Sequence, residues 1–557
     1  MKFSNILVVG LAAVALVACS KKDDDGAAPQ TEASAKAAKT DSASPLDSGF
    51  KLKNAEAVDI DKLLALIPAG ARPSYDRAEF DEKLGATVVT NLKFADAKDG
   101  ESVNVERAEF FGVDLDAIDR IKAATDAGVD APFETVFQKV RLLNVSANGF
   151  EDGEGAFSIG GVEFDQMAIR QGGVEGTGSG NEAARFFNAV NLAGLYFKDF
   201  SLAANEADAA SVALAAPDLR FVGLSGGRLG AIIANGLSYQ VDQSPETLAQ
   251  MGAAMGPQGA MILSSPLRNF IAPANQSVEM KSMEWRDIDF SGLMGWGLKG
   301  EEPPVSAKDL IDLGTVKATD IVTQINGKKA ATLDEATISA AEFTWLIPSK
   351  FRADSKGAVY DFTAYAVDGD EDTLAVLNEY GLDNVTGDGF AEWNWNTKSG
   401  VGDFDYVANM NGFADIAMGF GLGGLKLDDI AAAQENGADN VVAALGTLNG
   451  LSLTLADEKA LDAIFALSAL QMGGSGEDLR ASASGMIRLA GAQGAMMNPK
   501  IAAYVDAVAD FVARGGTLEI VADPADPVAF SALQSGAVSP ATLPDVLGLT
   551  VTHKEKK

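Results

Sequence analysis

The sequence is poor in the side chains that most enzymes and metal proteins use for chemistry. Its 557 residues include one cysteine, Cys19, and one histidine, His553. A single cysteine cannot form a disulfide within the chain, and a lone histidine leaves too few ligands for a zinc site. His553 belongs to a charged C-terminal stretch, where we expect its side chain to be solvated. The composition therefore predicts no histidine-dependent catalysis, no tightly held metal and no cofactor.

Positive charge and long apolar runs are also scarce. Lys and Arg together number 44 against 78 Asp and Glu, which gives a formal net charge of −34. Such a surface repels nucleic acids and anionic lipid head groups, so no nucleic-acid partner is expected. Beyond the N-terminus no window holds about 18 uncharged apolar residues, so no transmembrane helix is predicted. The length and the 47% hydrophobic content still allow about two to four domains with a sizeable core.

The N-terminus carries the most specific motif of the chain. Lys2 precedes the uncharged apolar run from Ile6 to Ala18, which is shorter than the roughly 20 residues of a membrane-spanning helix and fits a signal peptide. The run ends in Leu16-Val17-Ala18-Cys19. Here the sequence resembles the bacterial lipoprotein family, whose signal peptides end in Leu-x-Ala/Gly-Cys. The resemblance implies cleavage before Cys19, a diacylglycerol on its thiol, and an acyl chain, typically palmitate, on the new amino group.

The resemblance also implies a location. Three acyl chains, at about 0.8 kcal/mol for each buried methylene, make a stable membrane anchor. Ser20 follows the cysteine, and in this family a residue other than Asp at that position implies sorting to the outer membrane. We therefore expect a lipid-anchored protein of the cell envelope, on the outer membrane and facing the periplasm. The alternative is an uncleaved or ordinary secretory signal in which Cys19 is incidental.

Composition divides the chain into four regions. Ser20 to Ser48 is rich in Ala, Ser, Lys and Asp and has almost no large apolar residue, so it is expected to be a disordered tether. Its expected reach is about 30 Å. The predicted organisation is a signal peptide at 1–18, the tether at 19–48, a β-rich body at 49–425 with a possible division near residue 270, and a helix-rich α+β region at 426–557.

Strand-like alternation dominates the body, and its clearest instance is the segment from Phe390 to Met410. Ala391, Trp393 and Trp395 alternate with polar neighbours, Thr397 to Gly400 forms a turn, and apolar alternation resumes from Phe404. A further strand follows around Ile416 to Leu422. This pattern predicts an antiparallel meander with one polar and one apolar side. The tryptophans are expected to pack in its core, although they can also form a shelf for a ligand.

After about Lys426 the apolar period becomes helical. Asp457 to Met472 and Ile501 to Arg514 are predicted helices, each followed by a Gly-Gly pair, and Thr517 to Val521 is a predicted strand. The C-terminal tail, about 45 residues that close on Leu547-Gly548-Leu549, resembles uncharacterised alphaproteobacterial envelope proteins, which imply no activity. The fold class predicted is α+β: long antiparallel β-meander sheets, short helices on one face and a more helical C-terminal portion.

One acidic segment has the spacing of a calcium loop. Its carboxylates stand at positions 1, 3, 5 and 12 of the pattern, but Thr373 occupies the position where glycine makes the sharp turn. An acidic cap on a helix from Thr373 to Tyr380 is the preferred interpretation, and calcium is the alternative. The residues concerned are Asp368, Asp370, Asp372 and Glu379.

Two further patterns suggest catalysis only weakly. Gly223 to Gly227 matches the G-x-S-x-G turn of α/β-hydrolases, but its flanks predict strand–turn–strand instead of strand–turn–helix. Glu392 lies beside Trp393 and Trp395, as a glycosidase acid would, but alternation places it on the opposite face. No catalytic residue is therefore assigned.

Three functional hypotheses follow from the sequence. The first is a membrane-anchored envelope lipoprotein with a structural or partner-binding role and no catalysis. The second is a lipid- or glycolipid-handling protein with an apolar groove on a curved sheet. The third is an enzyme of unrecognised type. An open apolar trough on the sheet would favour the second hypothesis, and a closed core would favour the first.

Overall fold

The computed structural model describes residues 49–65, 73–95, 102–124, 127–148, 155–177, 180–205, 210–244, 247, 250, 273–435, 440–535, 538–539 and 541–556. The predicted signal peptide, Cys19, the tether and the possible division near residue 270 lie outside these residues. The chain forms two compact units. Unit 1 extends to residue 242 and adds 279–303 and 309–316, and unit 2 takes 243–278, 304–308 and 317 onward.

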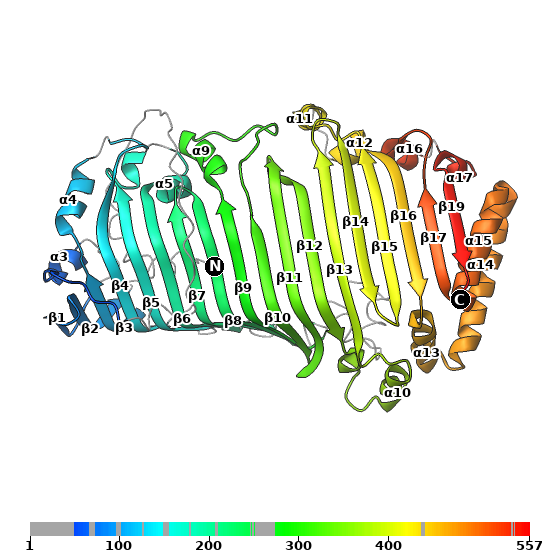
Figure 1. The fold of residues 1–557 in the computed structure, drawn as a ribbon, viewed down its shortest axis with the longest axis horizontal. Coiled ribbons are helices and arrows are strands. Elements are labelled where there is room, and N and C mark those ends of the chain that lie inside the picture. The colour runs from blue at the N-terminus through cyan, green and yellow to red at the C-terminus, as the bar shows by residue number, and fades with distance from the viewer. Residues whose placement is uncertain are drawn as a thin grey trace. The chain divides into compact units, whose positions relative to one another are not determined.

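Unit 1 is an antiparallel meander with short helices (Figure 1). Each strand from β2 to β6 pairs with the next strand along the chain, and β1 pairs with β2. Its strands are β1 (Arg77–Asp81), β2 (Ala86–Ala95), β3 (Ser102–Phe111), β4 (Phe133–Asn148), β5 (Gly155–Arg170), β6 (Val190–Asn205), β7 (Ala210–Ser225), β8 (Arg228–Gln243) and most of β9 (Asn275–Asp289). Its helices are α3 (Ile60–Leu64), α4 (Leu115–Ala123), the 3₁₀ turn η4 (Glu175–Thr177), α5 (Glu182–Ala189) and α9 (Ser291–Lys299).

One face of this meander carries the core of unit 1. Val89, Val140 and Phe164 on the strands are almost fully buried, and so are Ile118 and Ile121 on α4. Alternation with polar residues places the apolar strand residues on one face of each strand. The Asp114 side chain accepts a hydrogen bond from the Ala117 N–H and so caps α4. The helix α4 therefore begins directly after Asp114, at Leu115, and ends at Ala123.

Unit 2 contains a second antiparallel meander, in which β11 to β17 pair in chain order and β19 pairs with β17. Its strands are β10 (Thr315–Ile325), β11 (Lys328–Thr344), β12 (Ile347–Tyr360), β13 (Val385–Asn396), β14 (Val401–Met410), β15 (Ala414–Gly423), β16 (Thr447–Asp457), β17 (Gly516–Ala522), β18 (Val528–Ala529) and β19 (Leu549–Lys554). Its helices are η5 (Phe362–Tyr365), α10 (Glu371–Glu379), α11 (Leu427–Glu435), α12 (Val441–Leu445), α13 (Ala460–Met472), α14 (Gly476–Met497), α15 (Pro499–Arg514), α16 (Phe530–Gln534) and α17 (Leu543–Val546).

The predicted hairpin is present as β13 and β14. Trp393 lies opposite Phe404, and Ala391 lies opposite Tyr406, so the apolar residues of both strands share one face as expected. Gly400 closes the turn with a φ of +74°, a conformation that favours glycine. The next predicted strand is β15. Mostly antiparallel β structure with several helices is therefore confirmed as the fold class.

Among the helices of unit 2, α13 and α15 coincide closely with predicted helices, but α14 was not predicted. Its sequence contains several glycines, which are poor helix formers. Two of them allow α15 to approach closely: a Cβ at Gly491 would lie 2.3 Å from the Val505 side chain, and one at Gly494 would lie 2.9 Å from Ile501. Tertiary packing thus stabilises a helix that local propensity does not favour. No helix in the described part of the chain combines the length and the apolar character needed to cross a membrane.

Candidate functional site: the apolar face of unit 2

Strand register places apolar side chains in continuous rows across unit 2. The central row runs through Ile338, Ala353, Ala391, Tyr406, Met418, Leu453, Ile520 and Val551. One flanking row is Ala340, Phe351, Trp393, Phe404, Phe420, Leu451, Ala522 and Leu549, and the other is Ala336, Ser355, Gly389, Ala408, Ile416, Leu455, Leu518 and His553. We call these three rows the apolar face. They contain no Asp, Glu, Lys or Arg, and at about 4.8 Å between strands the central row is roughly 34 Å long.

The central row is not buried. Ile338 is 46% exposed and Tyr406 is 36% exposed, and the other members of the row are half-buried. A residue in the core of a sheet normally falls well below these values, as Val89 of unit 1 does at 0%. Within the described residues, the central row belongs to none of the buried hydrophobic clusters. The middle of the apolar face therefore presents apolar side chains that no described element fully covers.

Helices cover this face at both ends of the strands. At one end, Trp395 and Leu422 are buried against Leu427 and Ile430 of α11, with α12 and α16 contributing at the margin. At the other end, Val385 is buried with Leu377 of α10 and Ala463 of α13; the full cluster is Ala366, Leu377, Leu382, Val385 and Ala463. Figure 1 shows α11, α12 and α16 at one end of these strands and α10 and α13 at the other. The open part of the face is thus a basin with two helical rims.

The C-terminal edge of the basin is closed by α15. Its Phe511 is buried and lies edge-on to the His553 ring at 6.4 Å between centroids, and Tyr504 donates a hydrogen bond to the Leu549 carbonyl of β19. The His553 Nε2 lies 2.7 Å from the Gly515 carbonyl oxygen. The expectation of a solvated His553 was therefore wrong, because β19 pairs with β17 and carries this residue into the sheet.

The two tryptophans of β13 have different environments. Trp395 is only 7% exposed, and its indole Nε1–H donates a 3.0 Å hydrogen bond to the Leu425 carbonyl. Trp393 is half-buried and lies beside the open basin. Gly402 makes room for the Trp393 ring, since a Cβ there would come within 2.3 Å of it. Trp395 is therefore a core residue, and Trp393 is a lining residue of the apolar face.

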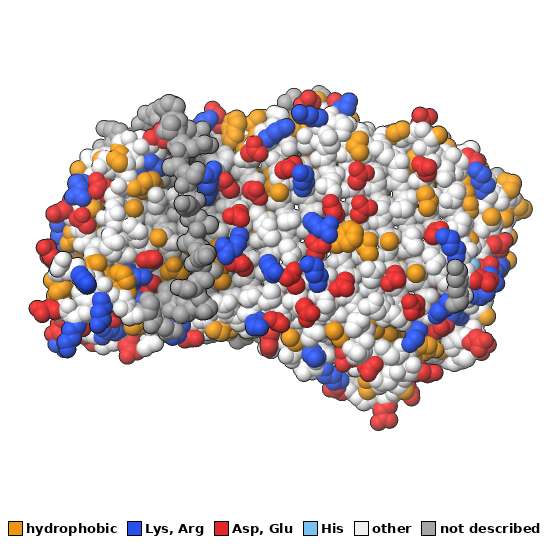
Figure 2. Space-filling view, in the orientation of Figure 1, with side chains coloured by type: hydrophobic (Ala, Val, Ile, Leu, Met, Phe, Trp, Pro, Cys, Tyr) orange, Lys and Arg blue, Asp and Glu red, His pale blue; other side chains and the backbone are white. Residues whose placement is uncertain are grey.

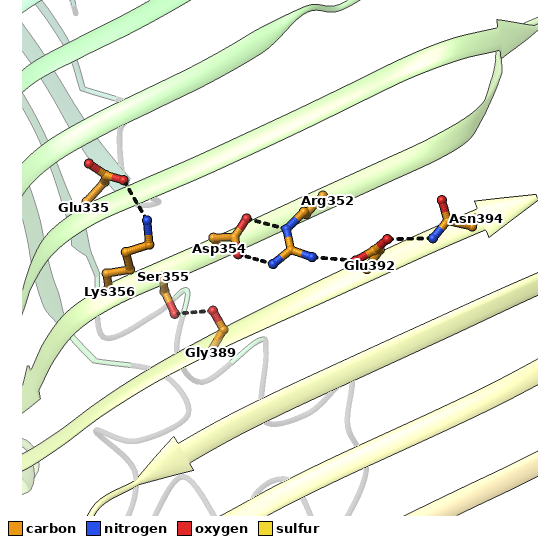
Figure 3. Close-up of polar contacts among 8 residues, drawn as sticks. All are labelled: Glu335, Arg352, Asp354, Ser355, Lys356, Gly389, Glu392 and Asn394. Atoms are coloured by element: carbon orange, nitrogen blue, oxygen red, sulfur yellow. Dashed lines mark hydrogen bonds and ion pairs between the residues drawn. The ribbon is translucent and has the colours of Figure 1, made fainter.

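The opposite face of the same strands is polar (Figure 3). Arg352 donates hydrogen bonds of 2.8 and 2.6 Å to Asp354 and one of 2.5 Å to Glu392, which also accepts one from Asn394 at 2.7 Å. In the view of Figure 2, acidic and basic side chains are spread over the strands of unit 2, with some hydrophobic side chains among them. Arg352 and Asn394 are exposed, so this face is chiefly solvated, and surface ion pairs of this kind contribute little to stability.

This hydrogen-bond network also bears on whether Glu392 can act as the acid of a glycosidase. Hydrogen bonds from Asn394 and Arg352 lower the pKa of its carboxyl, and the Arg352 hydrogen bond lowers the pKa of Asp354. A glycosidase needs one carboxyl with a raised pKa as the general acid. Glu392 has the opposite shift and points away from Trp393 and Trp395, as alternation predicted. The arrangement does not support glycoside hydrolysis at this place.

The four acidic residues of the calcium-like pattern do not converge. Asp370 is the N-cap of α10 and accepts hydrogen bonds from the Thr373 N–H and hydroxyl, and Asp368 forms a 2.7 Å ion pair with Lys328, which lowers its pKa. Asp372 and Glu379 lie near opposite ends of α10, about 10 Å apart along its axis at 1.5 Å per residue. Within the part of the chain described, no three His, Cys, Asp or Glu residues are placed to hold a metal.

The serine-hydrolase pattern lies in a hairpin. Ser225 is the last residue of β7, and Gly226 and Gly227 turn the chain into β8 with φ values of +57° and +79°. This strand–turn–strand setting is the one expected from the sequence, and it lacks the helix that a nucleophile elbow requires. Cys19, the predicted lipidation site, lies outside the described residues.

Sequence reasoning found the lining residues of β13 to β15 but missed those contributed by β11, β12 and β16. It predicted β17 as a strand but did not assign its apolar side to this face. Leu451, Leu453 and Leu455 alternate with Ser452 and Thr454 in the sequence, and this signal could have identified β16. The alignment of that strand with Met418 could not be predicted, because register between strands so far apart is set by tertiary pairing.

Comparisons with known proteins do not assign this face a role. A family model described as "Uncharacterized protein" matches residues 407–554, which span β14 to β19 of unit 2. No curated protein matches the chain. Among solved structures, a complex of P. aeruginosa FpvA with heterologous pyoverdines is similar over 69% of this chain and 53% of that one, at 9% identity and a TM-score of 0.15. The chain thus spans about half the length of that structure, and so low a TM-score carries no argument.

Proposed function

We propose that this protein is a lipid-anchored envelope protein whose unit 2 binds the acyl chains of a lipid or glycolipid on its apolar face. The observation that carries the proposal is the uncharged central row, with Ile338 46% exposed and Tyr406 36% exposed between two helical rims. Leaving such a surface in water is unfavourable by about 25 cal/mol for each Å² of apolar area. A ligand that covers it regains that free energy.

The chemistry of the face favours an acyl chain over a polypeptide. Protein interfaces typically contain about one hydrogen bond for every 100–200 Å². The central row offers one side-chain polar atom, the Tyr406 hydroxyl, and its backbone groups are already paired within the sheet. A saturated hydrocarbon needs no hydrogen-bond partner. In this proposal the short helices lie on one face of the sheet and form the walls of the basin. The more helical C-terminal portion contributes to the same walls.

A partner-binding role is the second candidate, because α14 exposes apolar side chains. Met486 is 62% exposed, Leu489 is 76% exposed and Met496 is 82% exposed. Contiguous exposed apolar residues often mark a protein interaction site. This role requires no acyl-chain ligand, so a direct binding assay separates the two candidates.

The anchor has its own test. Cys19→Ser should move the protein from the membrane fraction to the soluble periplasmic fraction, because the thiol that would carry diacylglycerol is absent. Labelled palmitate should enter the wild-type protein and not the variant. Equal membrane retention of the two forms would contradict the lipoprotein assignment.

The apolar face is tested with the soluble Cys19→Ser protein. After removal of bound lipid, titration with palmitate should show saturable binding with a dissociation constant in the micromolar range. That value corresponds to about −8 kcal/mol, or roughly ten methylene groups removed from water at about 0.8 kcal/mol each. Hexanoate, which has the same head group and a much shorter chain, is the control and should bind far more weakly. Equal binding of the two acids, or none, would contradict the proposal.

A further inference from the structure

Unit 1 contains a polar hollow that the proposed function does not use. It has a volume of about 520 Å³ and lies across β2 to β6. Its polar lining includes Lys93, Asn104, Glu106, Ser146, Ser158 and Asp199. Val105, Val145 and Ile159, which also border the hollow, are buried parts of the core on the other face, so the side chains that reach the hollow are polar.

The hollow forms where one extra residue interrupts the in–out alternation of side chains in each strand from β2 to β6, at the same level of the sheet. At this level two successive core residues of a strand are three positions apart. The pairs are Val89 and Leu92 of β2, Val105 and Ala108 of β3, Leu142 and Val145 of β4, and Ile159 and Val162 of β5. Strict alternation would space them by two. Each strand therefore contributes one extra residue here. We call these residues the slipped row: Asn91, Glu106, Asn144, Gly160 and Asp199.

Three members of the slipped row have left-handed backbone conformations, with φ of +53° at Asn91, +53° at Asn144 and +50° at Asp199. Asn and Asp tolerate this region better than other residues with a side chain. Another member of the row, Gly160, provides space, because a Cβ there would lie 2.9 Å from the Asp199 carboxylate. Strained backbone of this kind tends to occur where a ligand is held. In the slipped row it aligns amide and carboxylate groups along one line.

A second polar row lies directly beside the slipped row. Register pairs Lys93 with Asn104, Asn104 with Ser146, and Ser146 with Ser158. Ser158 in turn pairs with Ser201, and their hydroxyls are 2.8 Å apart. Neighbouring side chains in such a row are about 4.8 Å apart. The two rows together form a linear array of donors and acceptors.

Much of this array has no hydrogen-bond or ion-pair partner among the described residues. Asn144 donates a 2.6 Å hydrogen bond to Glu106, and Asn91 donates one of 2.6 Å to Asp76. In contrast, the side chains of Lys93, Asn104, Ser146 and Asp199 make no hydrogen bond or ion pair among the residues described. Four converging groups that include a cation, an amide, a hydroxyl and a carboxylate can both donate and accept. With Glu106 the net charge of the hollow is −1.

We propose that this hollow binds a glycan strand through its hydroxyl groups. A linear ligand with many hydroxyls, each able to donate and accept, matches two parallel rows of mixed polar groups. A phosphate or another anion does not match them, because two carboxylates face one lysine. The proposal concerns unit 1 alone, and it holds whether or not unit 2 binds acyl chains. N-acetylated and unmodified sugars share this hydroxyl chemistry, and the probes below distinguish them.

The test uses the full-length protein carrying Cys19→Ser and saturation-transfer difference NMR, which detects weak ligands of large proteins. The probes are chitotriose, whose sugars are N-acetylated, and maltotriose, whose sugars are not. At least one should give a saturable response, and which one responds assigns the sugar class. The double variant Asn104→Ala/Ser146→Ala should raise the dissociation constant at least tenfold, since it removes facing donors and acceptors from the middle of the hollow.

The matched control is Asn409→Ala, which removes an exposed strand asparagine from β14 of unit 2 and should leave sugar binding unchanged. Both altered residues of the double variant have ordinary strand conformations, so thermal melts of the three proteins should coincide. Absence of a response to both sugars would overturn the proposal. An unchanged dissociation constant in the double variant would overturn it as well, because binding would then lie elsewhere.

Discussion

Replacing Trp395 by alanine is expected to lower the free energy of unfolding of unit 2 by about 3–5 kcal/mol, as for other buried tryptophans. The side chain is 7% exposed and is packed with Leu422, Leu425 and Ile430. Its removal leaves a cavity that the rigid strands can refill only in part. It also leaves the Leu425 carbonyl without its 3.0 Å hydrogen bond, which adds the penalty of an unpaired buried acceptor.

Trp393→Ala is the matched comparison, because the two tryptophans lie two residues apart on the same face of β13. Trp393 is half-buried, so its truncation should cost less than half as much. Urea unfolding followed by far-ultraviolet circular dichroism measures both, and the transition of unit 2 should move to lower denaturant mainly in the first variant. Equal losses would contradict the distinction between a core tryptophan and a lining tryptophan.

The second large effect is expected from Met418→Glu, which should weaken palmitate binding at least tenfold. Met418 lies in the middle of the central row, between Tyr406 and Leu453. A carboxylate there has to lose water when an acyl chain covers it, and burying an unpaired charge costs several kcal/mol. Because each 1.4 kcal/mol corresponds to a factor of ten, tenfold is a lower bound.

The control for this variant is Ala417→Glu, in the next residue of the same strand. Ala417 pairs with Val407 and Thr454 on the opposite, polar face. It adds the same charge to β15 and should leave palmitate binding within about twofold of the unmodified protein. If Ala417→Glu weakens binding as much as Met418→Glu, the effect comes from net charge or altered folding, and the apolar face is not the binding surface.

The sequence predicted local structure well where alternation or capping was strong. The hairpin of β13 and β14 and the helix α15 both follow from patterns within about 20 residues. Prediction failed where distant pairing decides the outcome. His553 looked solvated because its neighbours are charged, yet β17 pairs with this segment and buries part of the ring. The glycines of α14 disfavour a helix, and the packing of α15 against them stabilises it.

The candidate sites show the same limit. Trp393, Phe404 and Met418 were recognisable as one apolar side of a meander, but their exposure was not, since it depends on where the helices end. The slipped row of unit 1 is even harder to predict from the sequence. Asn91, Asn144 and Asp199 are ordinary polar residues within strands, and only register places them on one line.

The most direct measurement of the central claim is quenching of tryptophan fluorescence by a brominated acyl chain. All five tryptophans lie between Trp285 and Trp395, and Trp393 is the one that lines the apolar face. Dibromostearate should quench part of the emission of the Cys19→Ser protein saturably, with the affinity found for palmitate. Trp393→Phe should remove most of that quenching, and Trp345→Phe, in the turn between β11 and β12, should leave it in place. Quenching that persists in Trp393→Phe, or that never saturates, would contradict acyl-chain binding on this face.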